Sequence, residues 1–333
     1  MKVYSGMAAE IPISQVAGYA QRVEGLGYDG LRVAETVHDG MLLAGLALDH
    51  TTSLRVSTAV VVAFPRSPMV TAIAAWDLQA LSGGRFGLGL GTQIKQNIEG
   101  RFSVPWEAPI ERMEEYVAAV RAIWQAFGEG GPLDVQGEHY RFSRLQPFFN
   151  PGPINHPDIP VLLGGVNPRI CELAGRVADG FITHPTNASA RFVAERIKPG
   201  LDSAGREVEL IVSPPLITGA DQRALSRARE HQRRKLGFLY STPAYGPSLE
   251  LYGWDDVGDR LRALARSGRW DDMAEVITDD MLDALVPQGT YDEIAGVLLD
   301  AYGGLTSSIG INPPDDPAED GAVAEIIRAL QAG

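Results

Sequence analysis

The sequence predicts an α/β fold, a (β/α)8 (TIM) barrel with insertions at its C-terminal mouth, and three observations support it. Short apolar runs alternate with amphipathic stretches along the chain, which is the pattern of parallel strands connected by helices. Eight such units fit within the 333 residues of the chain, the size expected of one barrel. The run at 54–64 is β-branched and almost entirely apolar, as in a strand buried on both faces.

The elements follow this alternation from one end of the chain to the other. The eight predicted strands cover residues 2–7, 28–35, 54–64, 85–91, 159–165, 180–184, 208–217 and 305–312. Apolar residues at helical spacing predict helices at 13–27, 40–51, 67–82, 109–127, 168–178, 188–205, 221–240, 290–302 and 320–331. Glycine closes the first helix and Pro68 lies in the first turn of the third, the usual boundary residues. Residues 137–142 are interpreted as a hairpin arm.

The competing architecture is a doubly wound open sheet, which usually carries a dinucleotide-binding glycine fingerprint after its first strand. The turn after the first predicted strand, YSGMAAEIPIS, has no such fingerprint. We therefore predict a single barrel domain over 1–333. Residues 238–287 are rich in Tyr, Trp and Asp, and we expect them to form a helical insertion or lid within it, with a packed capping segment as the alternative.

Composition argues against several classes of function. The net charge of −13 disfavours nucleic-acid binding, because an acidic surface repels phosphate. No apolar run approaches the ~20 residues of a membrane span, and the N-terminus lacks the apolar core of a signal peptide, so we expect a cytoplasmic protein without a membrane partner. The single cysteine, Cys171, allows no intrachain disulfide. No cluster has metal-ligand spacing, and we predict no metal.

The stretch GLGLG at 87–91 places its glycines on one face of a strand and its leucines on the other. Because glycine weakens a strand, such a bare face indicates that something approaches it closely. One interpretation is that a neighbouring element or large side chains need the room. The other is that Gly91 leaves space for a flat ligand at the barrel mouth, where barrel active sites lie.

A second glycine cluster, LGGVNPRICELAGR, begins where the fifth predicted strand ends. Gly164, Gly165, Val166 and Asn167 lead directly into a helix with Pro168 in its first turn. Backbone N–H groups at a helix N-terminus bind anions, so the turn has the geometry of a phosphate site. A plain strand-to-helix turn is the alternative.

Four motifs in this order resemble the bacterial luciferase-like superfamily: GLGYDGLRVAE, VSTAVVVAFPRSP, LQALSGGRFGLGLGT and AGRVADGFITH. Within it, the chain is most similar to the oxidoreductases that depend on the deazaflavin coenzyme F420. The segment LGGVNPRICELAGRVADGFI is typical of the same families. The resemblance extends over nearly the whole chain, from the first predicted strand to GINPP.

The resemblance implies a deazaflavin or flavin ring at the C-terminal mouth. A non-prolyl cis peptide in the third strand, here Ala59–Val60, would support the ring. The cofactor phosphate and tail would lie on the turn that contains Gly164, Gly165, Val166 and Asn167. The strand ends that frame the ring would contribute Glu35, Gly91, Thr92 and His184. Members of the family are often homodimers, and we expect the same here.

Candidate proton donors and charged ligands follow from position in the barrel. Glu35 ends the second predicted strand, and the alternative is a structural carboxylate paired with Arg32 or Arg66. His38 is a second candidate, or else a surface residue, and His184 ends the sixth strand in GFITH. Lys95 is either an anion ligand or a solvated loop lysine. Arg169, beside the phosphate turn, is a candidate for the acidic tail of F420.

The leading hypothesis is an F420-dependent oxidoreductase that transfers a hydride between the deazaflavin and a small organic substrate. The alternative keeps the fold and changes the chemistry: an FMN-dependent monooxygenase that uses O2 and reduced flavin, supplied by a partner reductase. A flavin or F420 reductase is therefore a candidate partner. A non-catalytic flavin-binding protein is a third interpretation. A hydrolytic barrel would need a carboxylate pair or metal ligands at the strand ends, and the sequence shows neither.

Overall fold

The computed structural model describes all residues 1–333, and its eight parallel strand positions close into a barrel. The order around the barrel is β3-β2-β1-β13-β10-β9-β8-β5, and β3 pairs again with β5 to complete the circle. These strands are β1 (Lys2–Gly6), β2 (Gly30–Val33), β3 (Arg55–Thr58), β5 (Phe86–Gly91), β8 (Val161–Gly164), β9 (Gly180–Ile182), β10 (Glu209–Val212) and β13 (Ser308–Gly310). The prediction of a (β/α)8 barrel is confirmed.

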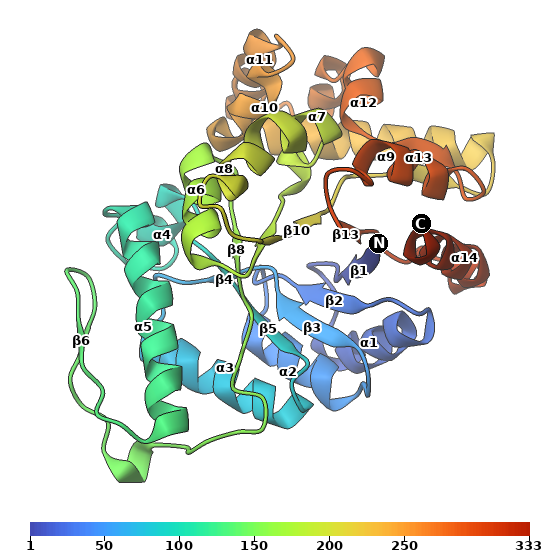
Figure 1. Ribbon diagram of the computed structural model, residues 1–333. Helices are drawn as coiled ribbons and strands as arrows, with labels where there is room; N and C mark the ends of the chain where they lie inside the picture. Colours follow the sequence, from blue (N-terminus) through green and yellow to red (C-terminus); the bar gives the residue numbers. More distant parts are fainter.

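Helices surround the strands, as Figure 1 shows. They are α1 (Val16–Gly25), α2 (Gly40–Asp49), α3 (Pro68–Ser82), α4 (Lys95–Gly100), α5 (Pro109–Glu129), α6 (Pro168–Val177), α7 (Ala190–Phe192), α8 (Lys198–Asp202), α9 (Gln222–Tyr240), α10 (Gly246–Glu250), α11 (Asp255–Arg266), α12 (Asp279–Leu285), α13 (Ile294–Tyr302) and α14 (Asp320–Ala332). A cluster of 59 buried residues fills the layer between helices and strands. No helix combines the length and apolarity needed to cross a membrane.

Three predicted elements have different bounds in the structure. The third strand bends at a cis peptide between Ala59 and Val60, as the resemblance predicts, and resumes as β4 (Val61–Val62). The predicted strand at 208–217 ends early because Pro214 and Pro215 lack N–H donors. Its remainder, β11 (Ile217–Gly219), pairs with β12 (Gln288–Thr290), so the helix predicted at 290–302 begins later.

Two smaller features complete the comparison. The helix predicted at 188–205 contains a π-helical segment, Val193–Ile197, just before Pro199, whose missing N–H removes one helical hydrogen bond. The predicted hairpin arm is β7 (Arg141–Phe142), which pairs antiparallel with β6 (Val135–Gln136).

Strand register determines which side chains enter the barrel. Gly6, Arg32 and Ser57 lie side by side on β1, β2 and β3. Because alternate residues face opposite ways, the inward set on β5 is Gly87, Gly89 and Gly91. A separate interior cluster is formed by Tyr4, Leu162, Ile182 and Ile211. Because all eight strands are parallel, their carboxyl ends meet at one mouth. Four of the strands end there with glycine: Gly6, Gly91, Gly164 and Gly310.

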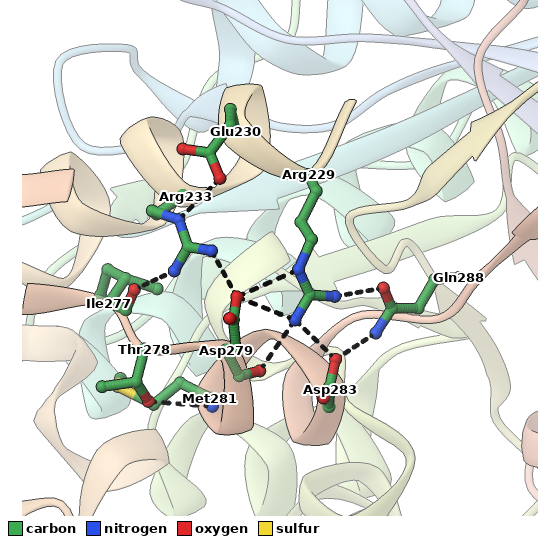
Figure 2. A network of polar contacts seen from close by, with 9 residues as sticks. All are labelled: Arg229, Glu230, Arg233, Ile277, Thr278, Asp279, Met281, Asp283 and Gln288. Carbon is green, nitrogen blue, oxygen red and sulfur yellow. Dashed lines mark hydrogen bonds and ion pairs between the residues drawn. The ribbon is translucent and has the colours of Figure 1, made fainter. Parts of the chain in front are cut away.

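The insertion predicted at 238–287 begins later, because α9 continues to Tyr240. Residues 241–287 contain the short helices α10, α11 and α12, which Figure 1 shows grouped near α9. Thirteen buried residues between Ile217 and Val286 form their own hydrophobic cluster. Figure 2 shows how arginines of α9 fasten α12: Arg229 contacts Asp283 (2.8 Å), and Arg233 contacts Asp279 (2.5 Å). This region is therefore anchored to α9, and its role as a lid stays a prediction.

Candidate active site

The glycine stripe of β5 makes room for the bend in the third strand. A Cβ atom on Gly89 would lie 1.9 Å from the carbonyl oxygen of Thr58, and one on Gly91 would lie 2.4 Å from Val60 Cγ2. The Thr58 hydroxyl also donates to the carbonyl of Gly89 and accepts from its N–H, both at 2.8 Å. Of the two interpretations of GLGLG, the close neighbour accounts for the contacts directly.

The bend leaves Val60 at the mouth of the barrel. Its side chain packs against the Cα atoms of Gly91 and Gly164, where a Cβ on Gly164 would lie 2.8 Å from Val60 Cγ1. Val60 and Ala59 are only partly buried. The result is a small apolar platform without projecting side chains on two neighbouring strands, a surface that a flat ring can contact.

The turn after β8 lies beside this platform. Its backbone N–H groups at Gly165, Val166 and Asn167 have no acceptor within the protein. The Asn167 side chain caps α6 by accepting from Ile170 N at 3.1 Å, and a Cβ on Gly165 would lie 2.4 Å from Ile170 Cγ2. Free donors at the start of a ten-residue helix fit an anionic group such as a phosphate.

Glu35 is held by a bidentate ion pair rather than facing an open space. Arg66 donates to both carboxylate oxygens, at 2.8 and 2.5 Å, and Val62 N donates to Oε2 at 2.7 Å. Arg66 also pairs with Asp39, the N-cap of α2, at 2.5 Å. These contacts tie the end of β2 to β4, immediately after the cis peptide, and favour the structural alternative for Glu35, with Arg66 as its partner.

His184 lies where β9 ends, and its ring stacks on Tyr245, a residue of the 241–287 region (centroids 4.6 Å apart). Its Nδ1 lies 2.8 Å from the Thr186 hydroxyl and accepts from Thr186 N at 3.3 Å, so we place the ring proton on Nε2, 3.4 Å from the Tyr245 hydroxyl. Burial, with a smaller contribution from Lys235, lowers the pKa of His184 to about 4. The ring is therefore neutral at pH 7.

The His184 segment is joined to the phosphate turn. Asn187 accepts from His184 N at 2.7 Å and donates to the carbonyl of Gly165 at 3.0 Å. The structure thus brings together most of the predicted residues at one mouth: Ala59, Val60, Gly91, Thr92, Gly164, Gly165, Val166, Asn167 and His184. Thr92 directly follows Gly91 and is partly buried, with its hydroxyl 3.2 Å from the carbonyl of Gln93.

Three predicted residues lie further out. Lys95 begins α4, is 60% exposed and approaches Glu99 at 3.8 Å. Arg169 is 65% exposed and pairs with Glu111 of α5 at 2.7 Å. His38 is partly buried in the loop between β2 and α2, and its side chain makes no hydrogen bond. Their functional roles stay predictions.

The opposite side of the mouth contains residues that sequence reasoning missed. A cavity of about 600 Å³ is lined by Arg32, Ser213, Asn312 and Lys235, among others. Arg32 does not pair with Glu35, as one alternative suggested, but donates to Ser213 Oγ at 2.5 Å. A charged residue inside an otherwise apolar strand is the signal that could have identified this site, because strand alternation places Arg32 inside the barrel.

A family model and the sequences of known proteins place the chain in the same family. The family model of luciferase-like monooxygenases matches residues 2–307. An uncharacterized protein of Mycobacterium tuberculosis (strain ATCC 25618 / H37Rv) is 40% identical over 304 residues, 89% of each chain. The 5,10-methylenetetrahydromethanopterin reductase of Archaeoglobus fulgidus is 27% identical over 287 residues, 83% of this chain and 82% of that one.

Solved structures show the same fold. The coenzyme F420-dependent tetrahydromethanopterin reductase from Methanopyrus kandleri superimposes with a TM-score of 0.78 at 18% identity, covering 99% of this chain and 98% of that one. The oxygenating constituent of 3,6-diketocamphane monooxygenase from Pseudomonas putida, in complex with FMN, gives 0.67 at 14% identity, covering 99% and 97%. The chain therefore belongs to the luciferase-like monooxygenase family, which confirms both the resemblance and the prediction of an oxidoreductase.

Proposed function

We propose that the protein is an F420-dependent oxidoreductase that transfers a hydride between the deazaflavin and a small organic substrate. The observation that carries the proposal is the apolar platform of Val60, Gly91 and Gly164 directly beside the free N–H groups of the phosphate turn. A cofactor with a flat ring joined to a phosphate-bearing tail requires an apolar surface for the ring and hydrogen-bond donors for the phosphate next to it. The F420-dependent relative of the same fold supports the proposal.

Each predicted cofactor residue has a place in this scheme. Ala59, Val60, Gly91 and Thr92 would contact the ring, and the N–H groups from Gly165 to Asn167 would hold the phosphate. Arg169 and Lys95 would meet the acidic tail, because their surface ion pairs are weak enough to exchange for another anion. When bound, the deazaflavin supplies the hydride chemistry.

We propose that His184 is the group that hydrogen-bonds to the substrate oxygen. Its neutral ring carries a proton on Nε2, and the nearest partner of that nitrogen, the Tyr245 hydroxyl, is at the long distance of 3.4 Å. Glu35 acts as a positioning residue that fixes the platform through Arg66. His38 is the remaining candidate for proton transfer from solvent.

The second candidate is an FMN-dependent monooxygenase that receives reduced flavin from a reductase. The same platform and the same turn accommodate the flavin ring and its phosphate, and one relative of the fold is seen with FMN. A homodimer is also part of the proposal. It is supported by exposed apolar side chains on the adjacent helices α2 and α3, namely Leu42, Val70, Ile73 and Leu81.

Fluorescence titration of the purified protein with F420, and with FMN in parallel, tests the proposal. We expect tight binding of F420 and much weaker binding of FMN. The opposite preference would replace the proposal by the monooxygenase, and binding of neither would contradict the assigned platform and phosphate turn.

A further inference from the structure

Arg32 extends across the inside of the barrel from β2 to the end of β10. Its guanidinium donates to Ser213 Oγ at 2.5 Å and lies 5.8 Å from the centre of the Tyr4 ring on β1. The path crosses β13 at Gly310, where a Cβ atom would lie 2.1 Å from Arg32 Nη2. The absence of a side chain at Gly310 therefore gives the guanidinium its route to the mouth.

The Arg32 charge has no counter-ion in the protein. Only 6% of the residue is exposed, its Nε has no hydrogen-bond partner, and it forms no ion pair. Desolvation lowers the pKa of the guanidinium to about 10, so it still carries its charge at neutral pH. Buried charges in proteins are normally paired, because an unpaired one loses its hydration without compensation.

Two better-satisfied arginines of the chain show how the fold treats a guanidinium when the role is structural. Arg85 donates five hydrogen bonds, four of them to backbone carbonyls. Arg66 is neutralised by Glu35 and Asp39. Arg32, the most buried of the three, has only one hydrogen-bond partner, the Ser213 hydroxyl. The contrast leaves the remaining Arg32 donors available to a ligand.

The cavity that Arg32 lines is large enough for a small organic molecule. It measures about 600 Å³ and includes Ser213, Asn312 and Lys235. Three carboxylates lie in its lining, and none forms an ion pair with Arg32: Glu319 accepts from the Tyr291 hydroxyl at 2.6 Å, Asp316 accepts from Ala318 N at 2.9 Å, and Asp315 is exposed to solvent. Arg32 thus supplies the buried positive charge of this cavity.

We propose that Arg32, assisted by the Ser213 hydroxyl, binds a carboxylate of the substrate. A guanidinium offers two N–H groups in the plane that a carboxylate accepts in bidentate fashion. A single buried charge and one hydroxyl match a monoanion better than a phosphate dianion. The inference rests on the proposed function, because it names the substrate class for the same barrel mouth.

Anion binding to the protein without cofactor tests this directly. Propionate and benzoate are compared with propionamide and benzamide, at constant ionic strength, by thermal shift and by ligand-detected NMR titration. We expect the two carboxylates to raise the Tm of the wild type and the two amides to leave it unchanged, since only a ligand of the folded state stabilises it. Equal effects of acid and amide would overturn the proposal, as would no binding by either carboxylate.

Variants separate the buried charge from the general charge of the cavity. Arg32→Met should weaken propionate binding by at least about tenfold, whereas Arg227→Met, which removes an exposed charge lining the same cavity, should leave it within about twofold. Arg32→Lys should restore part of the affinity. Equal losses in Arg32→Met and Arg227→Met would contradict the assignment.

Two further measurements distinguish a substrate-binding Arg32 from a structural or cofactor-binding one. The Tm of Arg32→Met should equal or exceed that of the wild type, because an unpaired buried charge is removed; a large decrease would show that Arg32 is structural. F420 affinity should be unchanged in Arg32→Met, and its loss would assign Arg32 to the cofactor, overturning this inference while leaving the proposed function intact. Tighter binding of inorganic phosphate than of propionate would overturn the carboxylate assignment.

Discussion

The two sides of the barrel mouth differ in what they offer a ligand. On the side of β3, β4, β5 and β8, side chains are absent, so backbone and Val60 form the surface and the strands approach one another closely. On the side of β1, β2, β10 and β13, a charged side chain is buried with most of its donors unused. The first side is built for shape and the second for charge, and the difference predicts which substitutions each side tolerates.

The largest effect should come from adding a methyl group to the first side at Gly89. In Gly89→Ala the new Cβ meets the carbonyl oxygen of Thr58 at 1.9 Å, and a backbone atom cannot rotate away. We expect a loss of about 3 kcal/mol or more in the free energy of unfolding, measured by urea denaturation. The matched control is Gly18→Ala in α1, where nothing lies within 4 Å, and which should be neutral or stabilising. Equal stability of the two variants would refute the packing argument.

His184 follows β9, the strand between β8 and β10, and its titration makes stability depend on pH. Its pKa is about 4 in the folded protein, lowered by burial from 6.5. Between these values the unfolded chain binds more protons than the folded one. The free energy of unfolding is therefore highest above pH 6.5 and decreases as the pH falls to 4. The expected loss is about 3 kcal/mol. His184→Phe, which keeps a ring against Tyr245, should show a flatter stability profile over this window; an unchanged slope would argue against the assignment.

A double-mutant cycle examines the platform itself. Gly91→Ala places its Cβ 2.4 Å from Val60 Cγ2, a side-chain atom, so we expect a cost of about 2 kcal/mol and at least tenfold weaker F420 binding, roughly. Val60→Ala removes the clash, and the double variant should regain stability relative to Gly91→Ala alone. Strict additivity of the two changes would mean that Val60 and Gly91 are not in contact.

The smallest effects are expected at the exposed cations. Arg169→Ala and Lys95→Ala remove surface ion pairs with Glu111 and Glu99, so the Tm should not change measurably. If the two cations meet the acidic tail of F420, each variant should weaken F420 binding by about two- to fivefold, an effect that high salt abolishes. Salt-independent weakening would indicate a different role.

The sequence was informative where a pattern repeats and less so where a single long-range contact decides. Alternation of strands and helices predicted the barrel, and register follows from period two, so the inward glycines were predictable. The division of the predicted strand 208–217 was not predicted, because its apolar run favours one strand whereas Pro214 and Pro215 end it. The partner of Glu35 could not be chosen between Arg32 and Arg66, because that choice depends on which strand position each guanidinium reaches.

The role of Arg32 was hidden for the same reason. Its signal in the sequence is one charge in the apolar run GLRVA, and only the closed barrel brings Ser213 and Gly310 to it from 181 and 278 residues away (213 − 32 and 310 − 32). The stacking of His184 on Tyr245 likewise depends on the 241–287 region returning to the mouth.

The division of the mouth into two binding regions is tested by the affinity for F420 with and without saturating propionate. If the cofactor lies on the platform and phosphate turn, and the substrate carboxylate on Arg32 at the opposite side of the mouth, both should bind together. We expect the F420 dissociation constant to change by less than about threefold. Mutually exclusive binding would place both ligands on the same groups and contradict the division of the mouth.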